Sequence, residues 1–238
     1  MRLILFDIDG TLIRSNRAGR AALVYALENL FGTAGPIDHY QMAGKTDPLI
    51  ITELLQAAGL DVRDVEERLE QVYELMAERG QILFPQTGIR PCPGVPELLQ
   101  ALQQRDGVVL GLVTGNNHLT APLKLAAAGI DPGRFVAGAY GSDDSDRNLL
   151  PALAMERAGR RLGYRFSGHS TVVVGDTPAD ILCAHASKAT AVAIATGSHA
   201  ADTLARYNPD YLLDNLMDTK TVLEIFVEGR SELERERK

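Results

Sequence analysis

Three short apolar runs, each followed by polar residues and then by a helical pattern, constrain the fold of this 238-residue chain most strongly. They lie at 3–6, 108–113 and 171–174. Such runs are typical of strands buried on both faces of a parallel sheet. Further strands are expected at 134–137, 190–195 and 211–213. Strands that alternate with helices predict a doubly wound, Rossmann-like α/β sheet.

The helical patterns predict an insertion between the first two long strands. Helices are expected at 17–31, 47–59, 61–80, 95–104, 117–128, 149–162 and 179–187, and no strand is expected between 12 and about 85. A crossover between parallel strands needs only about a dozen residues. We therefore predict an α/β core of residues 1–14 and 89–238 and an all-helical cap of residues 15–88. Such a cap suits a lid that closes over a site.

Two carboxylates follow the first apolar run. Asp7 and Asp9 are two apart on an extended chain, so they point to the same side about 7 Å apart. Open α/β sheets bind ligands at this end of the strands. Crowded carboxylates repel unless a cation or a proton intervenes, which suits a divalent cation and acid/base chemistry. Gly10 permits a sharp turn and Thr11 adds a hydroxyl and an amide; the plain alternative is that the aspartates cap a turn.

Two further strand ends carry polar groups. Thr114, Gly115 and Asn116 follow the second run, where a hydroxyl and free amides before a helix form a natural phosphate site. Asp176 ends the third run and Asp180 follows one helical turn later. The alternatives are ordinary N-capping by Thr114 or Asn116, and a first-turn acid at Asp180 that favours the helix dipole.

The order of these motifs resembles the haloacid dehalogenase-like (HAD) phosphohydrolase superfamily. Asp-Ile-Asp-Gly-Thr-Leu at 7–12 resembles its first motif, Thr114 its second, and Gly-Asp-x-x-x-Asp at 175–180 its fourth. The usual third motif is Lys followed by Pro, but no Lys lies between Lys124 and Lys188. We assign that role to Arg147, since a guanidinium can also bind phosphate oxygens. The alternative is a surface arginine that pairs with Asp143, Asp144 or Asp146.

The resemblance implies a magnesium-dependent phosphatase that acts through an aspartyl-phosphate. Asp7 would be the nucleophile and Asp9 the general acid/base. Thr114, Arg147 and the amides near Gly10 and Gly115 would hold the phosphoryl oxygens. The implied site residues are catalytic Asp7, Asp9, Thr114 and Arg147, the Mg²⁺ site of Asp7, the Asp9 carbonyl, Asp176 and the supporting Asp180, and substrate-binding Gly10, Thr11, Gly115, Asn116, Lys45 and Arg17.

The two cap residues in that set rest on weaker patterns. Gly-Lys-Thr-Asp at 44–47 resembles a cap loop that faces the core, where Lys45 would neutralise substrate charge. It is not a Walker A loop, because no apolar strand precedes it. Arg17 and Arg20 begin the first cap helix, and a solvated helix face is the competing interpretation for both.

The second aspartate of the first motif, Asp9, narrows the class of reaction that the resemblance implies. Dehalogenating and phosphonate-cleaving members of the superfamily lack it, so Asp9 favours phosphate ester hydrolysis. The nearest resemblance is to the phosphoglycolate phosphatase-like branch. Sugar-phosphate phosphatase, nucleotidase, pyrophosphatase and phosphoglucomutase activities stay open, and so does a catalytically idle binding protein.

The composition argues against several classes of partner. A net charge of −7 offers no electrostatic basis for binding nucleic acid or an anionic membrane. No apolar run is long enough to span a bilayer, and the N-terminus lacks a signal-peptide pattern. Cys92 and Cys183 are isolated and expected to be reduced. We expect a cytoplasmic protein whose partner is a small phosphorylated metabolite; the sequence does not predict its oligomeric state, and residues 229–238 are expected to fray or be disordered.

Overall fold

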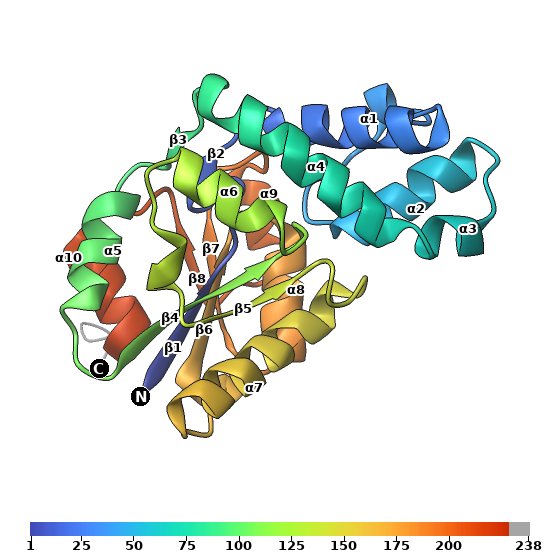
Figure 1. Ribbon diagram of the computed structural model, residues 1–238. Helices are drawn as coiled ribbons and strands as arrows, with labels where there is room; N and C mark the ends of the chain where they lie inside the picture. The colour runs from blue at the N-terminus through green and yellow to red at the C-terminus, as the bar shows by residue number, and fades with distance from the viewer. Residues whose placement is uncertain (229–238) are drawn as a thin grey trace.

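A six-stranded sheet forms the centre of the computed structural model, which describes residues 1–228 (Figure 1). The strand order is β5-β4-β1-β6-β7-β8, and each neighbouring pair is parallel. The strands are β1 Arg2–Phe6, β4 Val108–Thr114, β5 Ala137–Tyr140, β6 Thr171–Gly175, β7 Thr190–Ile194 and β8 Tyr211–Leu213. The predicted doubly wound α/β fold is confirmed.

Helices cover both faces of this sheet, which explains why its central strands are apolar throughout. Ile4 and Phe6 of β1 face one buried cluster, to which α5 Val95–Gln103, α6 Thr120–Ala127 and α10 Thr219–Leu223 contribute. Leu3 and Leu5 face the other cluster, with α7 Leu150–Leu162, α8 Pro178–Ala186 and α9 Ala201–Ala205. Successive side chains of a strand point to opposite faces, so a strand covered on both sides needs an unbroken apolar run.

A separate group of helices lies beyond the carboxyl ends of the strands (Figure 1). It consists of α1 Ala18–Phe31, α2 Asp47–Ala57, α3 Val62–Glu66 and α4 Leu69–Leu83. These helices bury a cluster of their own, which includes Leu27, Leu54 and Val72. The helix predicted at 61–80 is in fact two, because Arg68 leaves helical geometry; its guanidinium donates to the carbonyl of Leu30 and stacks on Phe31.

Two connections run side by side between the helical group and the sheet. β2 Ile13–Arg14 pairs antiparallel with β3 Arg90–Pro91. The expectation of no strand between residue 12 and about residue 85 was therefore wrong at β2, because a two-residue ladder leaves no hydrophobic run to detect. Asn16 Nδ2 donates to the carbonyls of Thr87 and Gly88, each at 3.0 Å, and so ties the two connections together. The exact division into residues 15–88 and the remainder stays a prediction.

The remaining differences from the sequence-based boundaries are small. β5 lies at 137–140 rather than 134–137, because Pro132–Arg134 forms a 3₁₀ turn and Ala137 pairs with Gly111 of β4. The short helices α9 and α10 were not predicted. Across residues 1–228, none of the helices combines the length and the apolar character that crossing a bilayer would require. The prediction for 229–238 lies outside the described residues.

Candidate active site

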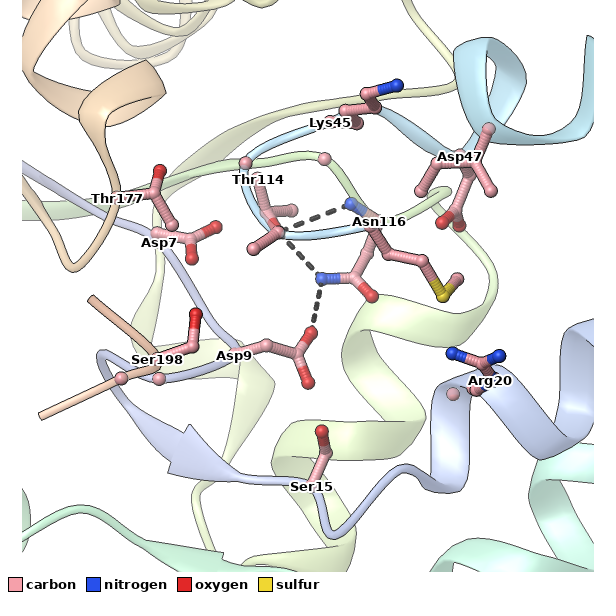
Figure 2. Close-up of a pocket in the computed structure, with 18 of the residues that line it drawn as sticks. Asp7, Asp9, Ser15, Arg20, Lys45, Asp47, Thr114, Asn116, Thr177 and Ser198 are labelled. Atoms are coloured by element: carbon pink, nitrogen blue, oxygen red, sulfur yellow. Dashed lines mark hydrogen bonds between the residues drawn. The ribbon is translucent and has the colours of Figure 1, made fainter. Parts of the chain in front are cut away.

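A cavity of about 450 Å³ opens between the carboxyl ends of the strands and the helical group. Figure 2 shows its wall, with Asp7 and Asp9 from the segment after β1, Thr114 from the end of β4 and Asn116 from the segment after β4. Of the predicted site residues, those that line it are Asp7, Asp9, Gly10, Arg17, Lys45, Thr114, Gly115, Asn116, Arg147 and Asp176. Thr11 and Asp180 are buried behind this wall. The strand ends therefore bring together side chains that are distant in sequence.

Three buried carboxylates converge at the base of this cavity. Asp7, Asp176 and Asp180 each offer an oxygen within 4.8 Å of the other two. Asp7 and Asp176 are neighbours because β1 pairs with β6, with Phe6 opposite Val174. Burial raises the pKa of both Asp7 and Asp176; repulsion from Asp180 adds to the effect at both, and repulsion from Asp7 adds to it at Asp176. A cluster of oxygen ligands that repel one another suits a hard divalent cation such as Mg²⁺.

Asp176 is held in a tight space between two backbone segments. A Cβ atom on Gly10, whose φ is 89°, or on Gly197 would clash with its carboxylate. Thr11, which is buried and does not line the cavity, donates from Oγ1 to Asp176 Oδ1 at 3.1 Å. Thr196, beside Gly197, donates to the carbonyl of Gly10 at 2.6 Å. The segment after β7 was not singled out from the sequence, although it follows a predicted strand at the same edge of the sheet.

Arg147 is the cation of the carboxylate cluster. Its Nη2 lies 3.0 Å from Asp7 Oδ1 and also pairs with Asp180. Its side chain is only 9% exposed, which excludes the alternative of a solvated surface arginine. Burial lowers the pKa of Arg147, but Asp180 and Asp7 outweigh burial and hold it above the ordinary value. Arg147 thus stays charged beside the predicted nucleophile.

Asp180 has less freedom to bind a metal than Asp7 or Asp176. Its Oδ1 pairs with Arg147, and its Oδ2 accepts hydrogen bonds from the amide and the hydroxyl of Thr177 at 3.0 and 2.7 Å. Both oxygens are therefore engaged. This arrangement favours the supporting role that the family resemblance implies for Asp180.

The residues after β4 connect Thr114 to Asp9. The Thr114 hydroxyl accepts hydrogen bonds from the amide and from Nδ2 of Asn116, at 3.3 and 2.8 Å. Asn116 Nδ2 also donates to Asp9 Oδ2 at 2.8 Å (Figure 2). A side chain on Gly115 would clash with the carbonyl of Lys45, so glycine there allows the loop at 44–47 to approach.

Lys124 is a further residue of this site to which the sequence analysis gave no role. Its side chain, on α6, is 7% exposed, and Nζ lies 2.7 Å from Asp9 Oδ2. Burial raises the pKa of Asp9, but the Lys124 ammonium and the hydrogen bond from Asn116 outweigh it and lower the pKa below its usual value. A signal was present, because Lys124 lies on the same helix face as the apolar Ala121 and Leu125.

The cations of the helical group that were predicted to face the substrate lie near the cavity, and some of them already have partners in the protein. Lys45 Nζ lies 2.6 Å from Glu53 Oε2 and 2.8 Å from the Tyr40 hydroxyl, so its charge is already paired. Arg17 lines the cavity from the N-terminus of α1, where its φ is 63°. Arg20 lies 3.6 Å from the exposed Asp38.

Asp47 joins the helical group to the sheet side of the cavity. Its buried Oδ2 accepts hydrogen bonds from the amide and from Nδ2 of Asn117, at 2.7 and 2.8 Å. Its own amide donates to the carbonyl of Gly115 at 2.7 Å. Thr46 Oγ1 adds a hydrogen bond of 2.9 Å to the carbonyl of Ser145. The cap loop is thus held against the segments after β4 and β5.

Known proteins share both the sequence pattern and the fold. A family model described as haloacid dehalogenase-like hydrolase matches residues 1–188. A phosphoglycolate phosphatase from Pectobacterium atrosepticum is 28% identical, with 92% of this chain and 90% of the relative covered. The pyrophosphatase PpaX from Oceanobacillus iheyensis is 24% identical, with 94% and 97% covered. The crystal structure of CbbY from Rhodobacter sphaeroides in complex with phosphate has a similar fold, with a TM-score of 0.68, 18% identity and coverage of 92% and 96%.

Proposed function

Because this chain belongs to the haloacid dehalogenase-like hydrolase family, we propose that it is a magnesium-dependent phosphatase that hydrolyses a small phosphomonoester through an aspartyl-phosphate. The observation that carries this proposal is the cluster of Asp7, Asp176 and Asp180 at the wall of the cavity, with Arg147 paired to Asp7 and Asp180. Asp9 lies in the same wall with a different set of partners. Two carboxylates in contrasting environments suit two different roles.

Asp7 is suited to attack phosphorus. It lies at the base of the cavity, and Arg147 contacts its Oδ1 and opposes the effect of burial on its ionisation. Its carboxylate would form a bond to phosphorus while the bond to the leaving oxygen breaks. Thr114 and Arg147 line the same wall and supply a hydroxyl and a guanidinium for the phosphoryl oxygens.

Asp9 is suited to exchange protons with the leaving group and with water. Because Lys124 and Asn116 hold it as a carboxylate, Asp9 would take up a proton as the phosphate ester binds. It would give that proton to the leaving oxygen and later accept one from the water that hydrolyses the aspartyl-phosphate. Asp7 and Asp176, supported by Asp180, fit a hard divalent cation because they offer crowded carboxylate oxygens. Bound Mg²⁺ would supply positive charge that offsets the negative charge of the phosphoryl group.

The proposed substrate is 2-phosphoglycolate, supported by the relative from Pectobacterium atrosepticum that carries that activity in its name. Pyrophosphate is the second candidate, because the relative from Oceanobacillus iheyensis is named a pyrophosphatase. Sugar phosphates, nucleotides and phosphoglucomutase chemistry are the remaining alternatives within the family. Side chains from the helical group, Arg17 and Tyr40 among them, line the part of the cavity that a leaving group would reach.

Phosphate release tests this proposal directly. The purified chain is assayed with Mg²⁺ on p-nitrophenyl phosphate, 2-phosphoglycolate, pyrophosphate, hexose phosphates and nucleoside monophosphates. We expect turnover that chelation by EDTA removes and added Mg²⁺ restores. Failure to turn over any of these compounds, with the protein folded and Mg²⁺ present, would favour an idle binding protein instead.

A further inference from the structure

We infer that Lys124 is a positioning residue for Asp9, and that its ammonium fixes the carboxylate that exchanges a proton with the leaving oxygen. The inference rests on the proposed function and adds to it a residue on α6 that none of the motifs contains. It is carried by the contacts of Lys124, by its burial, and by a glycine that leaves room for it.

The contacts form a closed arrangement of three side chains. Lys124 Nζ lies 2.7 Å from Asp9 Oδ2, and Asn116 Nδ2 donates to the same oxygen at 2.8 Å. Lys124 also donates to Asn116 Oδ1, so the two donors hold each other in place. A carboxylate oxygen that receives two fixed donors has little freedom to rotate. Lys124 therefore contributes to the orientation of Asp9 both directly and through Asn116.

The burial of Lys124 shows how specific this contact is. The side chain is 7% exposed, and an ammonium removed from water is costly unless it is paired. Burial raises the pKa of the nearby Asp47, and Lys124 opposes this rise only at longer range; the short ion pair of Lys124 is with Asp9. The ammonium of Lys124 therefore pairs with Asp9, the predicted general acid/base, and not with the carboxylate cluster around Asp7.

Gly19 leaves the space that the ammonium occupies. It lies in the first turn of α1, and a Cβ atom there would be 2.8 Å from Lys124 Nζ and 3.0 Å from Cε. The substitution Gly19→Ala would push the end of the lysine side chain aside. Alanine favours a helix more than glycine does, so this change moves the ammonium without weakening α1.

Substrates with different leaving groups can distinguish a loss of Asp9 positioning from general damage to the active site. In the free protein Asp9 is a carboxylate paired with Lys124, so it first takes up a proton from solvent as the phosphate ester binds. When the bond from phosphorus to an alkyl oxygen breaks, the electron pair stays on that oxygen, which takes this proton from Asp9. In the second step, water adds to phosphorus, the bond to Asp7 breaks, and a proton of the water passes to the Asp9 carboxylate. A p-nitrophenolate ion leaves readily without a proton, so its release depends far less on where Asp9 points.

The test compares an alkyl phosphate that the wild type hydrolyses, 2-phosphoglycolate first, with p-nitrophenyl phosphate. For Lys124→Met we expect kcat/KM to fall about 100-fold on the alkyl phosphate, within the range of general acid catalysis, and by less than about tenfold on p-nitrophenyl phosphate. Gly19→Ala is expected to show the same preference with a smaller loss. Lys220→Met is the matched control and is expected to leave kcat/KM on both substrates unchanged. It removes an exposed ammonium on α10, which lies 3.9 Å from Glu224.

A second comparison uses Asp9→Asn as background. If Lys124 acts through Asp9, adding Lys124→Met to Asp9→Asn gives no further difference between the two substrates. Equal losses on both substrates in Lys124→Met and Gly19→Ala would overturn the inference and leave the phosphatase proposal intact. A wild type that hydrolyses neither substrate would instead overturn the proposed function. If Lys124→Met fails to fold in circular dichroism, the result for Gly19→Ala decides.

Discussion

The two sides of the cavity wall differ in how their charges are balanced. On one side, Asp7 and Asp180 both pair with the guanidinium of Arg147, the third carboxylate, Asp176, accepts a hydrogen bond from Thr11, and burial and repulsion raise the pKa of Asp7. On the other side, Asp9 has its own ammonium in Lys124, and its pKa is lowered. The first side has a deficit of positive charge that a metal ion would fill. On the second side an ammonium of the protein itself balances the carboxylate charge, although Asp7 and Asp9 are only two residues apart.

The largest expected loss of activity comes from a substitution on the side of Asp7, Asp176 and Asp180, where negative charge exceeds positive charge. Asp7→Asn removes the proposed nucleophile, and we expect kcat to fall by about 10⁴-fold, as when an essential member of a catalytic unit is lost. Because the substitution also removes one repelling charge, the metal-free variant should unfold at a higher temperature than the metal-free wild type. Phosphate release and thermal unfolding measure the two effects. Asp143→Asn, which removes a partner of Arg157 outside the cavity, is the control.

Arg147→Met should produce the next largest loss. The substitution leaves Asp7 and Asp180 without their buried cation and removes the guanidinium proposed to bind the phosphoryl group. We expect kcat/KM to fall by about 10²- to 10³-fold, in the range for a lost electrostatic stabiliser. Unlike Lys124→Met, it should affect p-nitrophenyl phosphate and alkyl phosphates alike. A preference for one leaving group in this variant would contradict the division of the wall into two functional sides.

Removal of the metal should make stability depend on pH in a defined direction. Burial first, and then repulsion, raise the pKa of Asp7 to about 7. The folded state therefore favours the protonated form, so metal-free stability falls as the pH rises from about 4, the unfolded value, towards 7. Saturating Mg²⁺ should restore about 2.7 kcal/mol at a hundredfold excess over Kd. Denaturant unfolding at pH 5 and pH 8, with EDTA or Mg²⁺, measures this; equal stability at both values in EDTA would count against the charge deficit.

The smallest expected effect concerns the loop at 44–47, which joins the helical group to the segment after β4. Asp47→Ala removes the acceptor for two hydrogen bonds from Asn117 and leaves buried donors unpaired, at a cost of about 1–3 kcal/mol. We expect KM to rise by about tenfold with a smaller change in kcat, and trypsin to cleave more readily after Lys45. Asp61→Ala, which removes an N-cap of α3 elsewhere in the helical group, is the control and should leave KM unchanged. An unchanged KM and unchanged cleavage in Asp47→Ala would show that this contact does not hold the loop.

The sequence predicted the carboxylate side of the wall far better than the ammonium side. Asp7, Thr114 and Asp176 follow buried strands, and parallel strands bring their carboxyl ends to one edge whatever the intervening chain does. Lys124 and Asp47 lie on helices, and their contacts depend on how α6 and α2 pack. The same reason applies to Lys45, whose pairing with Glu53 and Tyr40 follows from the fold of the helical group and not from a local pattern.

The place of β1 in the sheet has a consequence for how the molecule is made. β1 is paired on one side with β4 and on the other with β6, so it is synthesised before both of the strands that flank it, which begin at Val108 and Thr171. Until those segments are synthesised, its backbone edges have no native partner and can pair with other chains. Because these pairings join distant parts of the chain, they also slow folding. The nascent chain therefore carries Asp7, the proposed nucleophile, beside an incomplete sheet until β6 has been synthesised.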